Sequence, residues 1–235
     1  MTSPATRAAR ARALWTVGIV IATVAVLVLA DRRGLGSRNA FRAPPALASR
    51  PVAAVGSAAE AFVVWRGSEL KGRRFLLLTG QWGSPLRSAG SAGSAGGVTA
   101  ASAAYWAARL GLARSFDVVM PPAAFEERRA EDATHPQYRP EPDAFRHDLH
   151  GFRLRFSLPG AVARLDEPVV VLVEPTWFRA GAPPDPLAWL SSAGLRTDLA
   201  LVALDDPAAT DADRRAAADY VRAARIPRLE IEMTP

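Results

Sequence analysis

Histidine and carboxylate side chains at three places in the chain could bind a metal ion or move a proton. His147 and His150 lie three residues apart in the sequence HDLH. Glu174 follows the apolar run VVVLV, and Asp205 and Asp206 follow the run DLALVAL. Imidazole and carboxylate groups bind divalent cations, and imidazole exchanges protons near neutral pH. These five residues are therefore the candidate ligands of a metal-dependent hydrolase, provided that the fold brings them together.

Each of these residues also has an ordinary structural interpretation. Pro140, Pro142 and Gly151 surround HDLH and favour a solvated loop. A glutamate at the end of a strand is commonly an exposed carboxylate. An aspartate before a proline, as in Asp206-Pro207, is typical of a turn. Both interpretations remain open at the level of the sequence.

Composition argues against several other chemistries. The 235 residues include no cysteine, which excludes disulfides, thiol nucleophiles and zinc–thiolate sites. The Gly/Ser/Ala-rich segment 80–97 lacks the Gly-Lys-Ser/Thr ending of a phosphate-binding loop. Ser84 lacks the G-x-S-x-G context of a hydrolase nucleophile. The net charge of +6 comes from scattered arginines and a single lysine. We therefore expect no cofactor and no nucleic-acid partner.

Alternating strands and helices must position these side chains. Apolar runs predict buried strands at 74–79, 116–120, 168–173 and 198–204, and alternating runs predict edge strands at 152–158 and 228–233. Helices are predicted at 57–66, 98–110, 123–131, 185–193 and 210–225, and residues 132–150 are predicted to form a long surface loop. This order predicts an α/β fold with a mostly parallel sheet and helices on both faces.

Capping residues support the helix assignments. Ser57 with Glu60, and Thr210 with Asp213, have the spacing of a capping box. Asp185-Pro186 is typical of a helix start. Gly111 and Gly194 are expected to end the helices that precede them.

The N-terminal region predicts a membrane anchor. Residues 1–12 form a basic head, and residues 13–30 contain no charged residue, a length close to the ~20 residues that cross a bilayer core. A cleavable signal peptide is the alternative, although its apolar region usually spans only about 7 to 15 residues. We expect an uncleaved single-pass anchor that contacts the lipid bilayer.

The anchor is followed by a predicted linker at 31–56, rich in Pro, Gly and Ala, and by a predicted α/β domain at 57–235. Arginines lie on both sides of the anchor, so the charge bias is nearly balanced. A short basic head favours export of the rest of the chain. We expect a bacterial inner-membrane protein with a periplasmic domain, and a cytoplasmic domain is the alternative.

The order of four segments resembles the arginase/deacetylase-like α/β fold, in particular its small uncharacterised bacterial branch. The segments are EAFVVWRGSELKGRRFLLLTGQWG, ASAAYWAARLGLARSFDVVMPP, LDEPVVVLVEPTWF and PLAWLSSAGLRTDLALVALDD. The resemblance would cover residues 57 to about 225. The resemblance implies a hydrolase scaffold that carries metal ligands at the tips of two strands.

The metal motifs of that family are degenerate here. At the first strand tip the chain reads LTGQWGS, residues 78–84, without a histidine or an acid. At the second tip the family's acids fall on Leu172, Glu174 and Thr176, of which only Glu174 is acidic. A metal site that activates water needs several such ligands. The resemblance therefore implies a scaffold whose hydrolytic site has been lost.

These observations lead to a membrane-anchored, non-catalytic α/β domain as the first hypothesis. It would act as a pseudoenzyme, a binding or structural subunit beside another membrane or periplasmic protein. The former active-site pocket is predicted to be lined by Gln81, Trp82, Glu174, Trp177 and Phe178. The alternative is a membrane-bound metal-dependent hydrolase with a site rebuilt from the five residues named first.

Overall fold

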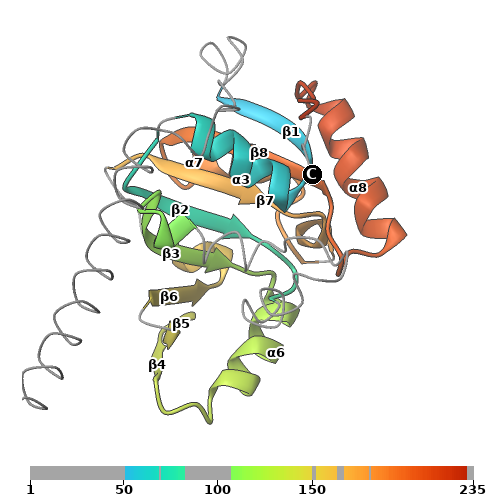
Figure 1. Ribbon diagram of the computed structural model, residues 1–235. Helices are drawn as coiled ribbons and strands as arrows, with labels where there is room; N and C mark the ends of the chain where they lie inside the picture. Colours follow the sequence, from blue (N-terminus) through green and yellow to red (C-terminus); the bar gives the residue numbers. More distant parts are fainter. Residues whose placement is uncertain are drawn as a thin grey trace, which may run out of the picture. The chain divides into compact units, whose positions relative to one another are not determined.

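The computed structural model describes residues 51–68, 70–82, 107–149, 152–162, 167–179 and 181–231. They fold as an α/β unit around one eight-stranded sheet (Figure 1). The predicted α/β class is therefore confirmed. The predicted anchor at 13–30 and the linker up to residue 50 lie outside the described residues. Within the described ranges, no helix is both long and apolar enough to cross a membrane.

The sheet is mostly parallel, as predicted. Its order is β1-β8-β7-β2-β3-β6-β5-β4. The first six strands in this order, from β1 to β6, are parallel to one another. Strands β5 and β4 form a hairpin that extends the sheet next to β6, with antiparallel pairing. The strands are β1 (Val52–Ser57), β2 (Arg73–Leu78), β3 (Ala113–Val119), β4 (Tyr138–Glu141), β5 (Ala144–Leu149), β6 (Phe152–Ser157), β7 (Val169–Val173) and β8 (Thr197–Asp205).

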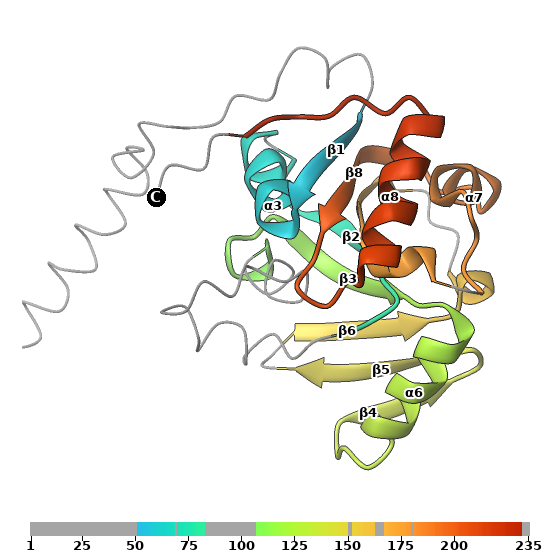
Figure 2. The same ribbon diagram turned by 90° about the vertical axis from the view of Figure 1, so that its right-hand side faces the viewer.

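Helices cover both faces of this sheet (Figure 2). Helices α3 (Ala58–Gly67) and α6 (Pro122–Asp132) pack on one face. Helices α7 (Pro186–Ser192) and α8 (Asp211–Ala223) pack on the other. All five residues of β7 are buried. This two-sided burial explains the uninterrupted apolar run of β7, because neither set of alternating side chains faces water.

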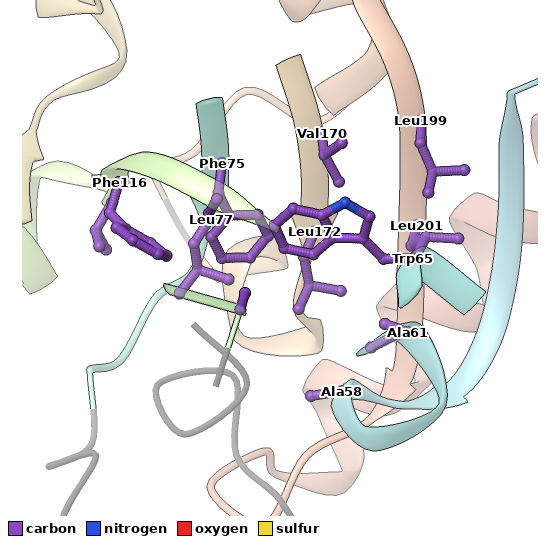
Figure 3. Packing of buried hydrophobic residues seen from close by; sticks show 14 of the residues in the cluster. Ala58, Ala61, Trp65, Phe75, Leu77, Phe116, Val170, Leu172, Leu199 and Leu201 are labelled. Atoms are coloured by element: carbon purple, nitrogen blue, oxygen red, sulfur yellow. The ribbon is translucent and has the colours of Figure 1, made fainter. Parts of the chain in front are cut away.

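Trp65 organises the core beneath α3. Its ring stacks on Phe75 of β2 with the ring centroids 5.0 Å apart, and Leu172 and Leu201 lie beside it (Figure 3). The indole N–H donates a hydrogen bond to the Leu70 carbonyl oxygen over 2.9 Å. The polar atom of this large side chain is therefore satisfied inside the core. The contact ties α3 to the centre of the sheet.

The predicted helix ends are confirmed. The Ser57 hydroxyl accepts from the Glu60 amide over 3.3 Å, and Glu60 Oε2 accepts from the Gly56 amide over 2.8 Å. Thr210 and Asp213 form the reciprocal capping box of α8. Gly111 and Gly194 have φ values of +67° and +71°. Because a Cβ disfavours this left-handed region, glycine is the residue that suits the end of each helix.

The predicted linker is wrong at its C-terminal end, because residues 52–57 form β1. Ala53, Ala54 and Val55 are fully buried between β8 and α3. Alanine has a weak strand propensity, so the composition of this segment resembled that of a linker. Pairing with β8 overrides that propensity. The folded unit therefore begins before residue 57.

The loop predicted at 132–150 is wrong for residues 138–149, which form the β4–β5 hairpin. Its two-residue turn is Pro142-Asp143, and Asp143 has a φ of +52°. Proline followed by aspartate is a recognised turn signal, since proline presets φ and aspartate tolerates the left-handed region. Of the prolines that suggested a loop, Pro142 thus lies in a turn between two short strands, and Pro140 lies within β4.

Strand β6 was predicted to lie at an edge, but it lies between β3 and β5. Leu154 and Phe156 enter the core shared with α6. On the other face, Arg155 Nη1 lies 3.6 Å from Asp117, and Arg155 Nε lies 3.0 Å from Glu141. The alternation therefore reflects an apolar face and an ion-paired face. The predicted last strand at 228–233 is reduced, in its described part, to one bridge between Arg228 and Ala54.

Candidate functional site: a polar pocket at the carboxyl rim of the sheet

The order in which strands are added to the sheet reverses between the parallel neighbours β2 and β7. From β2 the chain continues to β3 on one side, and from β7 it continues to β8 on the other side. In open α/β sheets, ligands bind outside the carboxyl ends of the strands at such a switch point. The segments after Leu78, Val119 and Val173 meet at this rim. The topology therefore marks the place where a site is expected.

A pocket of about 300 Å³ opens at this rim. Residues after β2, after β3 and after β7 line it, together with one side of α6. They are Gly80, Gln81, Trp82, Met120, Ala124, Glu127, Arg128, Glu131 and Arg179. Most of these side chains are polar or charged, so the pocket suits a hydrophilic molecule.

Thr176 holds the two strand tips together. Its hydroxyl lies 3.0 Å from the Thr79 hydroxyl and accepts a hydrogen bond from the Gly80 amide over 3.0 Å. The Thr176 carbonyl also lies against the Cα of Gly80, so that a Cβ at Gly80 would overlap it. The close approach of the two backbones requires glycine at this position. The pocket thus has a rigid floor.

Arg179 reaches the pocket from the β7 side. Its Nη2 and Nε atoms donate to the carboxylate of Asp213 over 3.0 and 3.3 Å. Its Nη1 atom contacts Gln81 Oε1 over a longer 3.4 Å. Burial raises the pKa of Asp213, but hydrogen bonds from Arg179 and Thr210 outweigh it, and the pKa is lowered overall. Asp213 is therefore a fixed anion that orients Arg179.

Arg128 reaches the pocket from α6 in a similar way. It holds the buried carboxylate of Asp132 by a bidentate pair, in which Nε donates over 2.9 Å and Nη2 donates to the second oxygen. Its Nη1 atom donates over 3.2 Å to Glu131, a mostly exposed side chain. The Asp132 carboxylate also lies 3.2 Å from His147 Nδ1. Asp132 therefore fixes the guanidinium group of Arg128, a residue that lines the pocket.

The structure places only part of the predicted pocket at this site. Gln81 and Trp82 line it. Glu174, only 4% exposed, and Trp177, fully buried, lie in the protein interior. Phe178 packs against Tyr220 with ring centroids 5.2 Å apart. The segment Pro175–Phe178 is a short 3₁₀ helix that packs into the core on the α8 side. Glu174, Trp177 and Phe178 do not line the pocket.

The four candidate metal ligands that the structure describes are not gathered. His147 on β5 lies four strands from the tip that carries Glu174, a lateral separation of about 19 Å at ~4.8 Å per strand. Asp205 pairs with Arg214, and Asp206 accepts from the Ala208 amide over 2.7 Å, as a turn residue does. His150 lies outside the described residues. Among the residues with described positions, no three His, Asp or Glu side chains could hold a metal ion.

The charged side chains of the pocket were missed by sequence reasoning. Arg128, with Asp132 four residues later, has the spacing of an ion pair on one helix face, a signal that was present but common. Arg179 follows the strand tip by five residues. Its partner Asp213 lies 34 residues further along the chain, so no local pattern could have revealed the pair.

No protein-family model, curated protein or solved structure matches this chain. The resemblance to the arginase/deacetylase-like fold therefore stays a prediction.

Proposed function

We propose that this protein binds a small polar molecule in the rim pocket and acts as a non-catalytic binding subunit. The observation that carries the proposal is the pair of guanidinium groups, Arg128 and Arg179. Both line the pocket, each is paired with a buried aspartate, and the Nη1 atom of each contacts another lining side chain. Arginines held in this way lose little side-chain entropy when a ligand arrives, so their hydrogen bonds contribute more to affinity.

The size and position of the pocket support a small ligand. A volume of about 300 Å³ lies at the lower end of the range for small-molecule sites. The sheet's switch point is also the position where open α/β sheets place their ligands. Typical drug-sized sites are mostly apolar, whereas this lining is mostly polar. A compact hydrophilic molecule is the occupant that fits.

The roles of the nearby carboxylates support binding over acid–base chemistry. Asp132 and Asp213 hold the two arginines, and Asp213 also caps α8. Asp205 pairs with Arg214, and Asp206 closes a turn. A general acid or base must be able to change its protonation state near the working pH. Asp213 does not suit this role, because burial raises its pKa but hydrogen bonds from Arg179 and Thr210 lower the pKa overall and favour its charged form.

The sequence supplies the proposed setting of this binding domain. Residues 13–30 would anchor the chain in a bacterial inner membrane, and the domain would face the periplasm beside a membrane or periplasmic partner protein. Descent from an arginase/deacetylase-like hydrolase is supported by the four quoted segments and by the neutral residues at 78–84. In that history the pocket would have kept its position while its chemistry changed.

The test is a binding screen on the full-length chain in detergent. Amino acids, dicarboxylates, sugars, polyamines and inorganic phosphate are screened by thermal shift, and hits are measured by calorimetry. We expect at least one compound to bind at one site per chain. We expect Arg179→Met to weaken it by about 10- to 100-fold, the effect of losing a hydrogen bond to a charged group.

The matched control is Arg222→Met on α8, where Arg222 is exposed and pairs with Asp219. It should leave the affinity unchanged. If no compound in the screen binds, or if Arg179→Met binds as tightly as the unmodified chain, the pocket is not the binding site.

A further inference from the structure

We infer that the ligand of the rim pocket is a zwitterion that carries both a carboxylate and an ammonium group, as a free amino acid does. The inference rests on the proposed function and adds the chemical class of the ligand. Two observations support the inference. One is the net charge of the groups around the pocket, and the other is that two of the acids are buried partners of arginines whereas two others line the pocket.

The positive charges of the pocket are already balanced. The carboxylates of Asp132 and Asp213 pair with Arg128 and Arg179, and their side chains are only 6% and 7% exposed. Two further acids, Glu127 and Glu131, line the same pocket. The two arginines and the four acids together carry a net charge of −2. The two glutamates would repel a simple anion such as phosphate, whereas they would attract a positively charged group.

The pocket lining offers both donors and acceptors. Arg128 Nη1 donates to the exposed Glu131 over 3.2 Å, and Arg179 Nη1 contacts the exposed Gln81 over 3.4 Å. A ligand carboxylate can replace these contacts with shorter charge-assisted hydrogen bonds. Glu127 and Glu131 offer only acceptors when ionised. Once a ligand carboxylate takes the Nη1 donor of Arg128, Glu131 needs a new donor, which an ammonium group of the same ligand can supply.

Trp82 adds a third element that suits a cation. It lines the pocket, and its ring packs against Phe156 at an interplanar angle of 88°, with the centroids 5.3 Å apart. This contact fixes the indole in one orientation. Tryptophan is the aromatic side chain that binds ammonium groups best, over distances up to about 6 Å. The pocket therefore combines two acids and an indole for a cation with two guanidinium donors for an anion.

The experiment compares matched probes on the full-length chain. The twenty common amino acids are tested by calorimetry, and each that binds is tested again as its N-acetyl derivative and as its amide. The first derivative lacks the ammonium group, and the second lacks the carboxylate. We expect each change to weaken binding at least tenfold. We expect the double variant Glu127→Gln, Glu131→Gln to weaken binding of the amino acid but not of its N-acetyl derivative.

Glu126→Gln is the control variant, because Glu126 lies on the same helix, pairs with Arg129 and is exposed. It should bind the amino acid as the unmodified chain does. The inference is overturned if the N-acetyl derivative binds equally well, if the double variant binds normally, or if only non-zwitterionic compounds bind. In each of these cases the pocket remains a binding site. If no polar compound binds, the proposed function itself fails.

Discussion

At the scale of single residues, the arrangement of the strand tips at the rim depends on the hydroxyl of Thr176 and on the absence of a Cβ at Gly80. Thr176 bonds to Thr79 and to the Gly80 amide, and Gly80 lets the Thr176 carbonyl approach its Cα. All three residues are buried. A buried amide that loses its partner is costly, so the arrangement of both strand tips is strongly specified.

We expect Thr176→Val to lower the free energy of unfolding by about 1–3 kcal/mol, because the Gly80 amide would be left without an acceptor. The measurement is denaturant unfolding together with hydrogen exchange at the Gly80 amide. Thr176→Ser keeps the hydroxyl and serves as the control, so its Gly80 amide should stay protected. Equal protection in the valine and serine variants would contradict this account.

The residues of the site were only partly predictable. Gln81 and Trp82 could be placed at the rim because they follow a strongly apolar strand, and strand tips gather at one edge of a parallel sheet. Glu174 also follows such a strand but is buried and does not line the pocket, and the 3₁₀ turn that begins after it is indicated by no local pattern. The pairing of Arg179 with Asp213 depends on tertiary structure, which composition and spacing do not encode.

At the scale of elements, the N-terminus of α8 combines a structural and a site role. Asp213 completes the capping box with Thr210 and holds Arg179 at the pocket. The start of the helix was predictable, since Thr-x-x-Asp is a local signal. The β4–β5 hairpin was not predicted, because its short strands carry polar side chains and a proline. Short polar strands gain their stability from neighbours rather than from their own residues.

The stability of the protein should depend on Asp213 at acid pH. Its pKa in the folded state lies below the ordinary value of 3.8. The folded state thus binds this proton less readily than the unfolded state, so the contribution is complete above pH 3.8 and is lost as the pH falls through the lower folded-state value. The free energy of unfolding, measured between about pH 2 and pH 6, should fall less steeply for Asp213→Asn.

Asp219→Asn on the same helix is the control, since Asp219 is exposed and pairs only with Arg222. Its pH profile should follow that of the unmodified chain. A profile for Asp213→Asn that is parallel to both would show that the pair with Arg179 does not contribute to acid sensitivity.

At the scale of the whole molecule, one border of the sheet is formed by β1, although the composition of this segment predicted a linker. Strand β1 buries Ala53, Ala54 and Val55 and pairs with β8 along nearly its full length. The fold class was predictable because apolar strands and capped helices alternate along the chain. The number of strands was not, since β1 is made of small residues that gain their preference from the sheet.

Truncation tests this boundary. A chain of residues 41–235 should unfold cooperatively, whereas a chain of residues 58–235 should lack cooperative unfolding because the outer side of β8 and the inner side of α3 would be exposed. Circular dichroism during thermal denaturation is the measurement. If the shorter chain has an equal melting temperature, β1 is dispensable for folding, and the predicted boundary between the linker and the domain at residues 56 and 57 would be correct.

The two borders of the sheet share a property that affects how copies of the protein meet. On one border, the backbone around Arg228 bonds to both polar groups of Ala54, with Ala54 N–H donating to Pro227 and Leu229 N–H donating to Ala54. On the other border, β4 carries Pro140, which has no N–H to offer. Neither border presents an unbroken row of donors and acceptors to a second molecule. Crowded copies should therefore resist joining into continuous intermolecular sheets, the first step toward amyloid-like assembly.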